Sequence, residues 1–482
     1  MSLLRPAFAV LGLILVILAA LMLLPLFLLI TGDAPDSRAF LVSSAMTAGT
    51  GLLLYFLNRG TLRHLTTRKV FLITATNWIG VAAFAGIPFH FSDLHLSITD
   101  AVFESVSGIT TTGSTVLKGL DGLPADILLW RSITQWLGGI GIVAMAVMIL
   151  PFLRVGGMRL FKSESSDWSD KATPQIRVQL QYLVIVYLIL SVLCMAYYWG
   201  FGMSFFDAVN HAMTTLSTGG YSTHDSSIGF YQSKPLLWGS VVFMALSGVP
   251  FTIYVHILVS RRFTYTADAQ VRFYLQLLCI AGITMGFYLF FTDQMDISTA
   301  MVHGFLNTTS IMTTTGYVSD DFGKWGSGAI AVFFFLTFVG GCSGSTSGGI
   351  KVFRFQLFWL YLREQFVRSV HPNAIITLEY NNRRVTEDVI KSSIAFMYMA
   401  MWSYAIMTII LSMCGLDLIT STTGALTALM NVGPGLGDIV GPSGNFQTLP
   451  DIAKWVLSLG MLLGRLEYLT LYILLTPMYW RN

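Results

Sequence analysis

The segment Thr110-Thr111-Thr112-Gly113-Ser114 closes a short apolar run and is the first of four glycine-centred turns in the chain. The other three turns read Ser217-Thr218-Gly219-Gly220-Tyr221, Thr313-Thr314-Thr315-Gly316-Tyr317 and Asn431-Val432-Gly433-Pro434. Each turn lies between two long apolar stretches. Glycine permits an extended backbone that can present its carbonyl oxygens to an ion. Four such turns in one chain therefore predict a ring of carbonyls around a dehydrated cation.

The residues expected to form this filter surround the glycine of each turn. They are Thr111, Thr112, Gly113, Thr218, Gly219, Gly220, Thr314, Thr315, Gly316, Asn431, Val432 and Gly433. The fourth turn is aligned with the first through Gly433 and Gly113, and an offset of one residue is an alternative alignment. The short runs before the turns should be helices whose partly negative C-terminal ends point at the ion.

The composition places the chain in a membrane. Of its 482 residues, 54% are hydrophobic and only 11% are charged, whereas a soluble domain carries about 25% charged residues. Apolar stretches of about 20 residues, long enough to span lipid, recur along the chain. The predicted spans are residues 6–30, 39–57, 70–91, 127–152, 178–201, 235–259, 271–292, 327–350, 389–414 and 452–478. The fold class is therefore an all-α polytopic membrane protein.

Charge placement orients the chain. When the loops alternate between the two sides, most of the 28 Lys and Arg residues fall on the side of the N-terminus. The positive-inside rule then predicts a cytoplasmic N-terminus. Acidic residues such as Asp93, Asp207 and Asp320 fall on the outer side. They either concentrate cations at an acidic mouth or simply occupy loops.

A unit of span, re-entrant loop and span recurs four times after residue 69. The predicted units are residues 70–176, 177–269, 270–387 and 388–482, preceded by a two-helix extension over residues 1–69. The re-entrant runs are too short to cross lipid, and non-helical backbone at membrane depth must be covered by protein or water. Convergence of the four runs on one axis satisfies that requirement. The alternative is four ordinary outer loops rich in Thr and Gly.

A Gly/Ser-rich stretch interrupts the span of the third unit. Residues 340–349 include five Gly and three Ser, and each Gly in a helix costs about 1 kcal/mol relative to Ala. We expect the helix to break here, just below the filter. The small residues at the break, to which the family resemblance given below assigns a gate, include Gly340, Gly341, Gly344, Ser345, Gly348 and Gly349. A small-residue face for helix packing is the alternative.

Arg465 is the one basic residue that the predicted spans place deep in the membrane. An arginine at this depth costs roughly 2.5–3.5 kcal/mol on insertion scales. We therefore expect Arg465 to face a wet cavity or a polar partner. Glu467 is two residues further on and points elsewhere, because only positions three or four apart share a helix face. A purely structural arginine is the alternative.

Catalytic groupings are absent from the sequence. The four cysteines are dispersed in or beside apolar runs, and the eight histidines are scattered. Lys351 is separated from the glycines of the 340–349 stretch by Ile350, so the phosphate-loop pattern fails. The sequence therefore predicts that the chain is not an enzyme and binds no nucleotide or nucleic acid.

The four turns, the span–loop–span units and the break at residues 340–349 resemble the Trk/Ktr/HKT superfamily of potassium transporters. The two additional N-terminal spans and the length are similar to its bacterial Trk membrane subunits. The resemblance covers essentially the whole chain and implies a pseudo-fourfold pore. It also implies K⁺ as the transported ion, held by backbone carbonyls of the filter residues. In the plant branch of the superfamily, a serine at the first filter position accompanies sodium selectivity, so Gly113 favours K⁺ here.

The resemblance also implies a gate, partners and a location. It implies an intramembrane loop at residues 340–349 that moves during gating, with Arg465 beside it on the conduction path. The expected partners are a second copy of the chain in a homodimer, and a cytosolic, TrkA-like ring of nucleotide-binding regulators. The expected location is the bacterial inner membrane. A K⁺/H⁺ or K⁺/Na⁺ symporter is the alternative to a gated channel. The Asn-Val-Gly-Pro turn departs most from a potassium-channel loop, which predicts a short filter.

Overall fold

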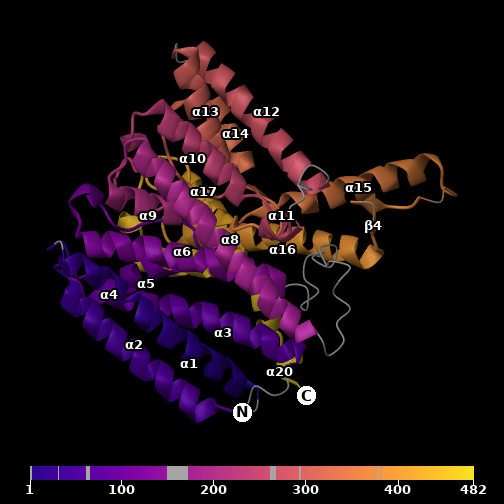
Figure 1. Cartoon of the computed structure of the whole chain (residues 1–482). Helices are drawn as coiled ribbons and strands as arrows, with labels where there is room; N and C mark the ends of the chain where they lie inside the picture. The colour runs from indigo at the N-terminus through magenta and orange to yellow at the C-terminus, as the bar shows by residue number, and fades with distance from the viewer. Residues whose placement is uncertain are drawn as a thin grey trace.

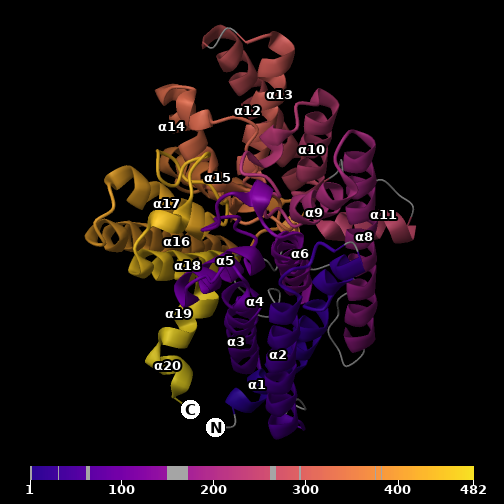
Figure 2. The same cartoon turned by 90° about the vertical axis from the view of Figure 1, so that its left-hand side faces the viewer.

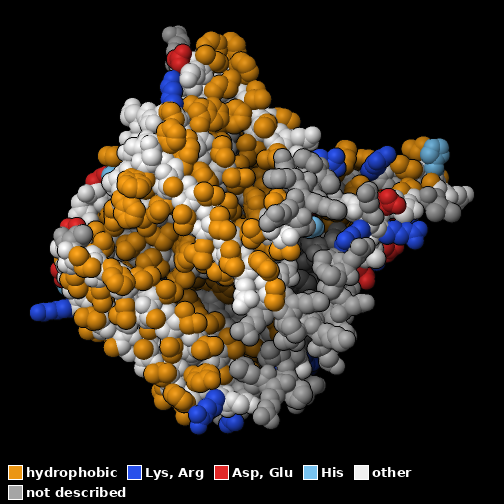
Figure 3. Space-filling view, in the orientation of Figure 1, with side chains coloured by type: hydrophobic (Ala, Val, Ile, Leu, Met, Phe, Trp, Pro, Cys, Tyr) orange, Lys and Arg blue, Asp and Glu red, His pale blue; other side chains and the backbone are white. Residues whose placement is uncertain are grey.

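The computed structural model describes residues 3–30, 32–60, 66–148, 172–260, 268–292, 295–374, 376–381 and 383–481. Within these residues, seven helices are long and apolar enough to cross a membrane, and two bent helix pairs raise the number to nine. Hydrophobic side chains cover most of the face shown in Figure 3. An exposed apolar surface of this extent fits lipid rather than water as the surrounding solvent.

The N-terminal residues form a helical hairpin beside the rest of the molecule. Helix α1 (Leu4–Leu21) continues through a 3₁₀ turn, η1 (Leu24–Ile30), and α2 (Ser37–Asn58) packs along it. Helix α1 also packs on α3 (Thr67–Ala85). The hairpin lies at the indigo end of the colour scale in Figure 1.

The remaining chain repeats one pattern, in which a long outer helix packs on a short helix and a third helix follows. The first group contains α3, α4 (Ile87–Phe91), α5 (Ile98–Ile109), η2 (Leu120–Gly122) and α6 (Ala125–Met148). The second contains α8 (Ala172–Gly200), α9 (Phe205–Leu216), η4 (Ser227–Phe230), α10 (Lys234–Ser247) and α11 (Phe251–Ser260).

The third group contains α12 (Ala269–Thr292), α13 (Ile297–Met312), η6 (Phe322–Lys324), α14 (Ser327–Leu336), β1 (Val339–Gly340), β2 (Ile350–Lys351) and α15 (Val352–Val370). A small hairpin of β3 (Glu379–Tyr380) and β4 (Arg383–Arg384) leads to the fourth group. That group contains α16 (Glu387–Met413), α17 (Leu418–Met430), η7 (Phe446–Thr448), α18 (Asp451–Arg465), α19 (Leu469–Leu475) and α20 (Pro477–Trp480).

The groups interlock in chain order. Helix α6 of the first group packs on α9 of the second, α10 packs on α13, and α18 of the fourth group returns to pack on α5 of the first. The two chain ends lie near each other in both Figure 1 and Figure 2. Helix α15 and the β3–β4 hairpin protrude from the helical body in Figure 1.

Three predicted spans are not straight helices. The span over 327–350 was expected to break, and α14 has only ten residues before the non-helical stretch begins. The span over 235–259 bends by 87° between α10 and α11, where Gly248 and Pro250 interrupt the helix. The span over 452–478 bends by 114° between α18 and α19. Glu467 and Tyr468 take positive φ values of 59° and 37° at that bend.

Candidate functional site

The four short helices α5, α9, α13 and α17 begin and end alike. At each start, a side-chain oxygen accepts a hydrogen bond from a backbone N–H of the first turn, which is the usual N-cap. The four capping residues are Ser97, Ser204, Asp296 and Asp417. At each end, two backbone hydrogen bonds form the Schellman pattern. In each pattern, one bond joins residues five positions apart. The backbone N–H groups of these bonds belong to Thr112, Gly219, Thr315 and Val432, and they donate to the carbonyls of Ser107, Thr214, Ser310 and Thr427, respectively, at 2.8–3.1 Å.

The residue two positions before each turn glycine has a left-handed backbone. The four residues and their φ values are Thr111 (50°), Thr218 (52°), Thr314 (58°) and Asn431 (55°). The glycines that follow also have positive φ, namely Gly113 (90°), Gly220 (72°), Gly316 (79°) and Gly433 (107°). The shared spacing aligns Gly433 with Gly113 without an offset.

Three of these left-handed residues are threonines, for which this conformation is strained. A left-handed L-residue costs roughly 1–2 kcal/mol, and Asn relieves part of that cost by local hydrogen bonding. Only the fourth turn uses Asn. Backbone strain of this kind collects at functional sites, where the surrounding structure enforces it. The strain here falls on the backbone that carries the predicted carbonyl ligands.

The four turns meet one another in a closed ring. A Cβ atom added to any of the four glycines would lie closer than 3.0 Å to a carbonyl oxygen of the next turn, a separation that real Cβ atoms essentially never show. The glycine and carbonyl pairs are Gly113 with Gly219, Gly220 with Thr315, Gly316 with Val432 and Gly433 with Thr112. The ring therefore runs once around in chain order, and the last turn closes on the first.

Some carbonyls of the ring already accept hydrogen bonds from side chains. Gln135 Nε2 donates to the Gly219 oxygen (2.6 Å), and Ser114 Oγ donates to the Gly433 oxygen (2.9 Å). Asn431 Nδ2 donates to Thr112 Oγ1 (2.9 Å), across the junction of the fourth and first turns. The turns are thus held by unequal contacts, although their backbones share one conformation.

Two tyrosines connect neighbouring turns of the ring by hydrogen bonds. Each follows a turn glycine and reaches the short helix of the preceding group. Tyr221 Oη donates to the Glu104 carbonyl of α5 (2.9 Å), and Tyr317 Oη donates to the His211 carbonyl of α9 (3.1 Å). Both side chains are buried. They fix the spacing between neighbouring turns from outside the ring.

A buried ion pair lies behind the first two turns. Arg131 Nε and Glu104 Oε1 are 2.8 Å apart, and both side chains are almost fully buried. Glu104 also accepts from the Val116 N–H, and Arg131 packs over the Tyr221 ring at 4.1 Å. This pair was not predicted from the sequence. The available signal was the presence of a glutamate, Glu104, within the short apolar run before the first turn.

The carboxylates that charge placement predicts to be on the outer side make local hydrogen bonds. Asp207 accepts from Thr223 (2.7 Å) and Asp320 from the Trp325 indole (2.8 Å). His224 is hydrogen-bonded to Asp121 (2.5 Å), and this bond lowers the pKa of the Asp121 carboxyl. These contacts give three of the outer carboxylates a structural use in the loops.

Residues 341–349 form an irregular loop directly below the ring. Parallel pairing of β1 with β2 closes the loop, with Val339 opposite Ile350. Gly349 N–H donates to the Met430 carbonyl at the end of α17 (2.8 Å), and Gly348 N–H donates to Thr314 Oγ1 of the third turn (2.6 Å). Cys342 N–H donates to the Gly248 carbonyl at the α10–α11 break (2.9 Å). The loop is therefore attached to three of the four groups, counting its own.

Four charged side chains surround the lower side of this loop. Arg465 Nη1 donates to the Thr346 carbonyl (3.0 Å), and Lys351 Nζ donates to the Ser347 carbonyl. Arg354 Nη2 pairs with Glu467 Oε2 at 2.5 Å. All four residues are buried, so Arg465 shares the protein interior with two further basic residues, Lys351 and Arg354. The unwound α18–α19 bend turns Glu467 to Arg354 rather than to Arg465.

Comparison with known proteins agrees with this geometry. The sequence model of the TrkH family, described as a cation transport protein, matches residues 36–482. The chain belongs to the TrkH family of cation transport proteins. The potassium transporter TrkH from Vibrio parahaemolyticus superposes with a TM-score of 0.92, at 33% identity, and 99% of each chain is covered.

Curated relatives of the family match along nearly their whole length. The Trk system potassium uptake protein TrkI of Halomonas elongata is 44% identical over 479 residues, which are 99% of this chain and 97% of TrkI. The Trk system potassium uptake protein TrkH of Escherichia coli K12 is 34% identical over 483 residues, with 98% of each protein covered. The family assignment carries the membrane fold with it, and its members are transport proteins rather than enzymes.

Proposed function

We propose that this chain takes up potassium across the bacterial inner membrane through a gated, K⁺-selective pore. The closed ring of the four glycine turns is the observation that carries this proposal. The curated relatives named above are potassium uptake proteins.

The ring acts as the selectivity filter. Backbone carbonyls around Gly113, Gly220, Gly316 and Gly433 replace the hydration shell of K⁺. The C-terminal ends of α5, α9, α13 and α17 add partial negative charge. The four turns are chemically unequal, and side chains already occupy the Gly219 and Gly433 oxygens. These two features favour a short filter with few equivalent sites.

The loop at residues 340–349 acts as the gate. It lies below the ring and contacts the third turn through Thr314. Arg465 holds the loop through the Thr346 carbonyl and places a positive charge beneath the filter. Opening requires the loop to leave these contacts, after which K⁺ can pass.

The same proposal includes the internal repeats, the orientation and the partners. The repeats are residues 70–176, 177–269, 270–387 and 388–482, with the two-helix extension at residues 1–69. The N-terminus is cytoplasmic, the chain forms a homodimer, and a cytosolic nucleotide-binding ring regulates it. The basic, protruding α15 supports a cytosolic docking role, since Figure 3 shows Lys and Arg gathered on that arm.

Ion flux into liposomes that contain only the purified chain tests the proposal. A gated pore should carry K⁺ down its own gradient, in preference to Na⁺, with or without a proton gradient. K⁺ movement that requires a proton or sodium gradient would instead establish a symporter. No K⁺ movement in either condition, with folded protein in the vesicles, would contradict transport by this chain.

A further inference from the structure

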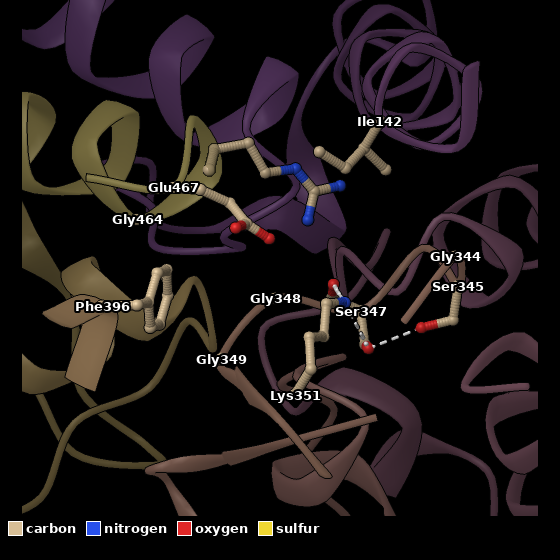
Figure 4. Close-up of a pocket in the computed structure, with 11 residues that line it drawn as sticks. Ile142, Gly344, Ser345, Ser347, Gly348, Gly349, Lys351, Phe396, Gly464 and Glu467 are labelled. Atoms are coloured by element: carbon tan, nitrogen blue, oxygen red, sulfur yellow. Dashed lines mark hydrogen bonds between the residues drawn. The ribbon is translucent and has the colours of Figure 1, made fainter. Parts of the chain in front are cut away.

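A small, partly open cavity lies below the loop. Its volume is about 30 Å³, and it is lined by loop residues together with Ile142, Phe396 and Gly464. Lys351, Arg465 and Glu467 also line it. Figure 4 shows Lys351 extending to Ser347, with Phe396 and Glu467 on one side and Gly344 and Ser345 on the other.

The charges around this cavity do not balance. Two cations and one carboxylate line it within the described residues. That carboxylate, Glu467, is already paired with Arg354 from outside the lining. Lys351 and Arg465 are only 7% and 2% exposed. Within the described part of the chain, two positive charges thus remain in the interior without a carboxylate, an arrangement that is unfavourable unless an anion compensates it.

Arg465 also has unused hydrogen-bond donors. Its Nη1 donates to Thr346, but Nε and Nη2 have no partner within the described chain. Lys351 Nζ bonds the carbonyl and the hydroxyl of Ser347, both of which are neutral. The guanidinium fork presents several donors in a fixed plane, suited to a negatively charged acceptor. The unused donors belong to a buried side chain that lines the cavity.

We infer that the cavity binds a monoatomic halide, chloride in the cell, between Lys351 and Arg465. A volume of about 30 Å³ holds about two water molecules, so it admits a bare halide with one water. The halide neutralises part of the charge excess and links Arg465 of α18 to Lys351 at the base of the loop. It therefore favours the loop position seen here, and its binding does not depend on transport.

Anomalous scattering from crystals grown in sodium bromide tests this inference. We expect one bromide peak in the cavity, within contact distance of Lys351 Nζ and the Arg465 guanidinium. The peak should be lost in Lys351→Met and kept in Lys324→Met, which removes a lysine that is 81% exposed. Wild-type crystals in bromide without a peak at this position would overturn the proposal, whether or not the variants fold.

Thermal unfolding in detergent gives a solution readout. At constant ionic strength, replacing gluconate by chloride should raise the unfolding midpoint of the wild type, because a ligand that binds only the folded state stabilises it. Lys324→Met should show the same rise. A rise of equal size in Lys351→Met would place the responsible chloride elsewhere and would contradict this site.

Discussion

Single glycines decide how closely the backbones approach at this site. Gly138 of α6 is an example outside the ring, since an added Cβ would lie closer than 3.0 Å to the Ile109 carbonyl at the end of α5. Gly141 lies one turn further along the same helix, and its added Cβ would meet Trp78 at an ordinary 3.6 Å. A comparison of the two positions therefore distinguishes the steric requirement for glycine from the low helix propensity of glycine.

We predict opposite effects for alanine at these two positions. Gly138→Ala should destabilise the protein by about 1–3 kcal/mol, the usual cost of overpacking. Gly141→Ala should be neutral or stabilising, because Ala favours helix by about 1 kcal/mol over Gly. Thermal unfolding in detergent measures both. Equal stability of the two variants would show that α6 does not press on the end of α5.

The buried Glu104–Arg131 pair gives a second prediction at this scale. Removal of one partner leaves an uncompensated buried charge and should cost about 3–5 kcal/mol. Glu104→Gln and Arg131→Met should therefore each lower the unfolding midpoint strongly. The double variant should lose less than the sum of the two single losses. Strictly additive losses would mean that the two side chains do not act as a pair.

Residue-level contacts of this kind are only partly readable from the sequence. The four turn glycines were recognisable in the sequence, because glycine adopts the positive φ values of these turns more readily than any other residue. The left-handed threonines are not predictable, since a β-branched residue disfavours that conformation and only neighbouring turns enforce it. The Arg131–Glu104 pair was not predictable either, because the distance between the two side chains depends on how α5 and α6 pack.

Among the elements, the loop over residues 341–349 is the least regular and makes the most varied contacts. Its glycine content was sufficient to predict that the helix breaks. Its attachment to Met430, Gly248 and Thr314 involves two other groups as well as its own, and it could not be predicted from local sequence. The bends after α10 and α18 were missed because apolar runs 235–259 and 452–478 are long enough to read as straight spans.

The contact between the loop and α18 makes a prediction about basal flux. Arg465→Ala removes the bond to Thr346 and the positive charge below the filter, so K⁺ flux should rise several-fold. Arg465→Lys should be intermediate, because it keeps the charge but loses the planar fork of donors. Arg368→Ala is the control, since Arg368 is 52% exposed. Lower flux in a folded Arg465→Ala protein would assign Arg465 a structural role.

The whole molecule is organised by the order in which the four groups meet. The first group contacts the second, the second contacts the third, and the fourth returns to the first through α18 and α5. The helical class was predictable, because long apolar stretches recur along the chain, and the division into four units with the bounds given above stays a prediction. The order of the ring was not, since it depends on contacts between residues hundreds of positions apart, such as Gly433 with Thr112.

The K⁺/Na⁺ permeability ratio of Gly113→Ser, measured under bi-ionic conditions in liposomes, tests the filter most directly. A side chain at Gly113 collides with the Gly219 carbonyl, so the ratio should fall about tenfold, a loss of about 1.4 kcal/mol in discrimination. Gly122→Ser is the matched control, because nothing lies within 4 Å of a Cβ there, and it should keep the wild-type ratio. An unchanged ratio in Gly113→Ser, with folded protein and intact flux, would contradict the assignment of the ring as the selectivity filter.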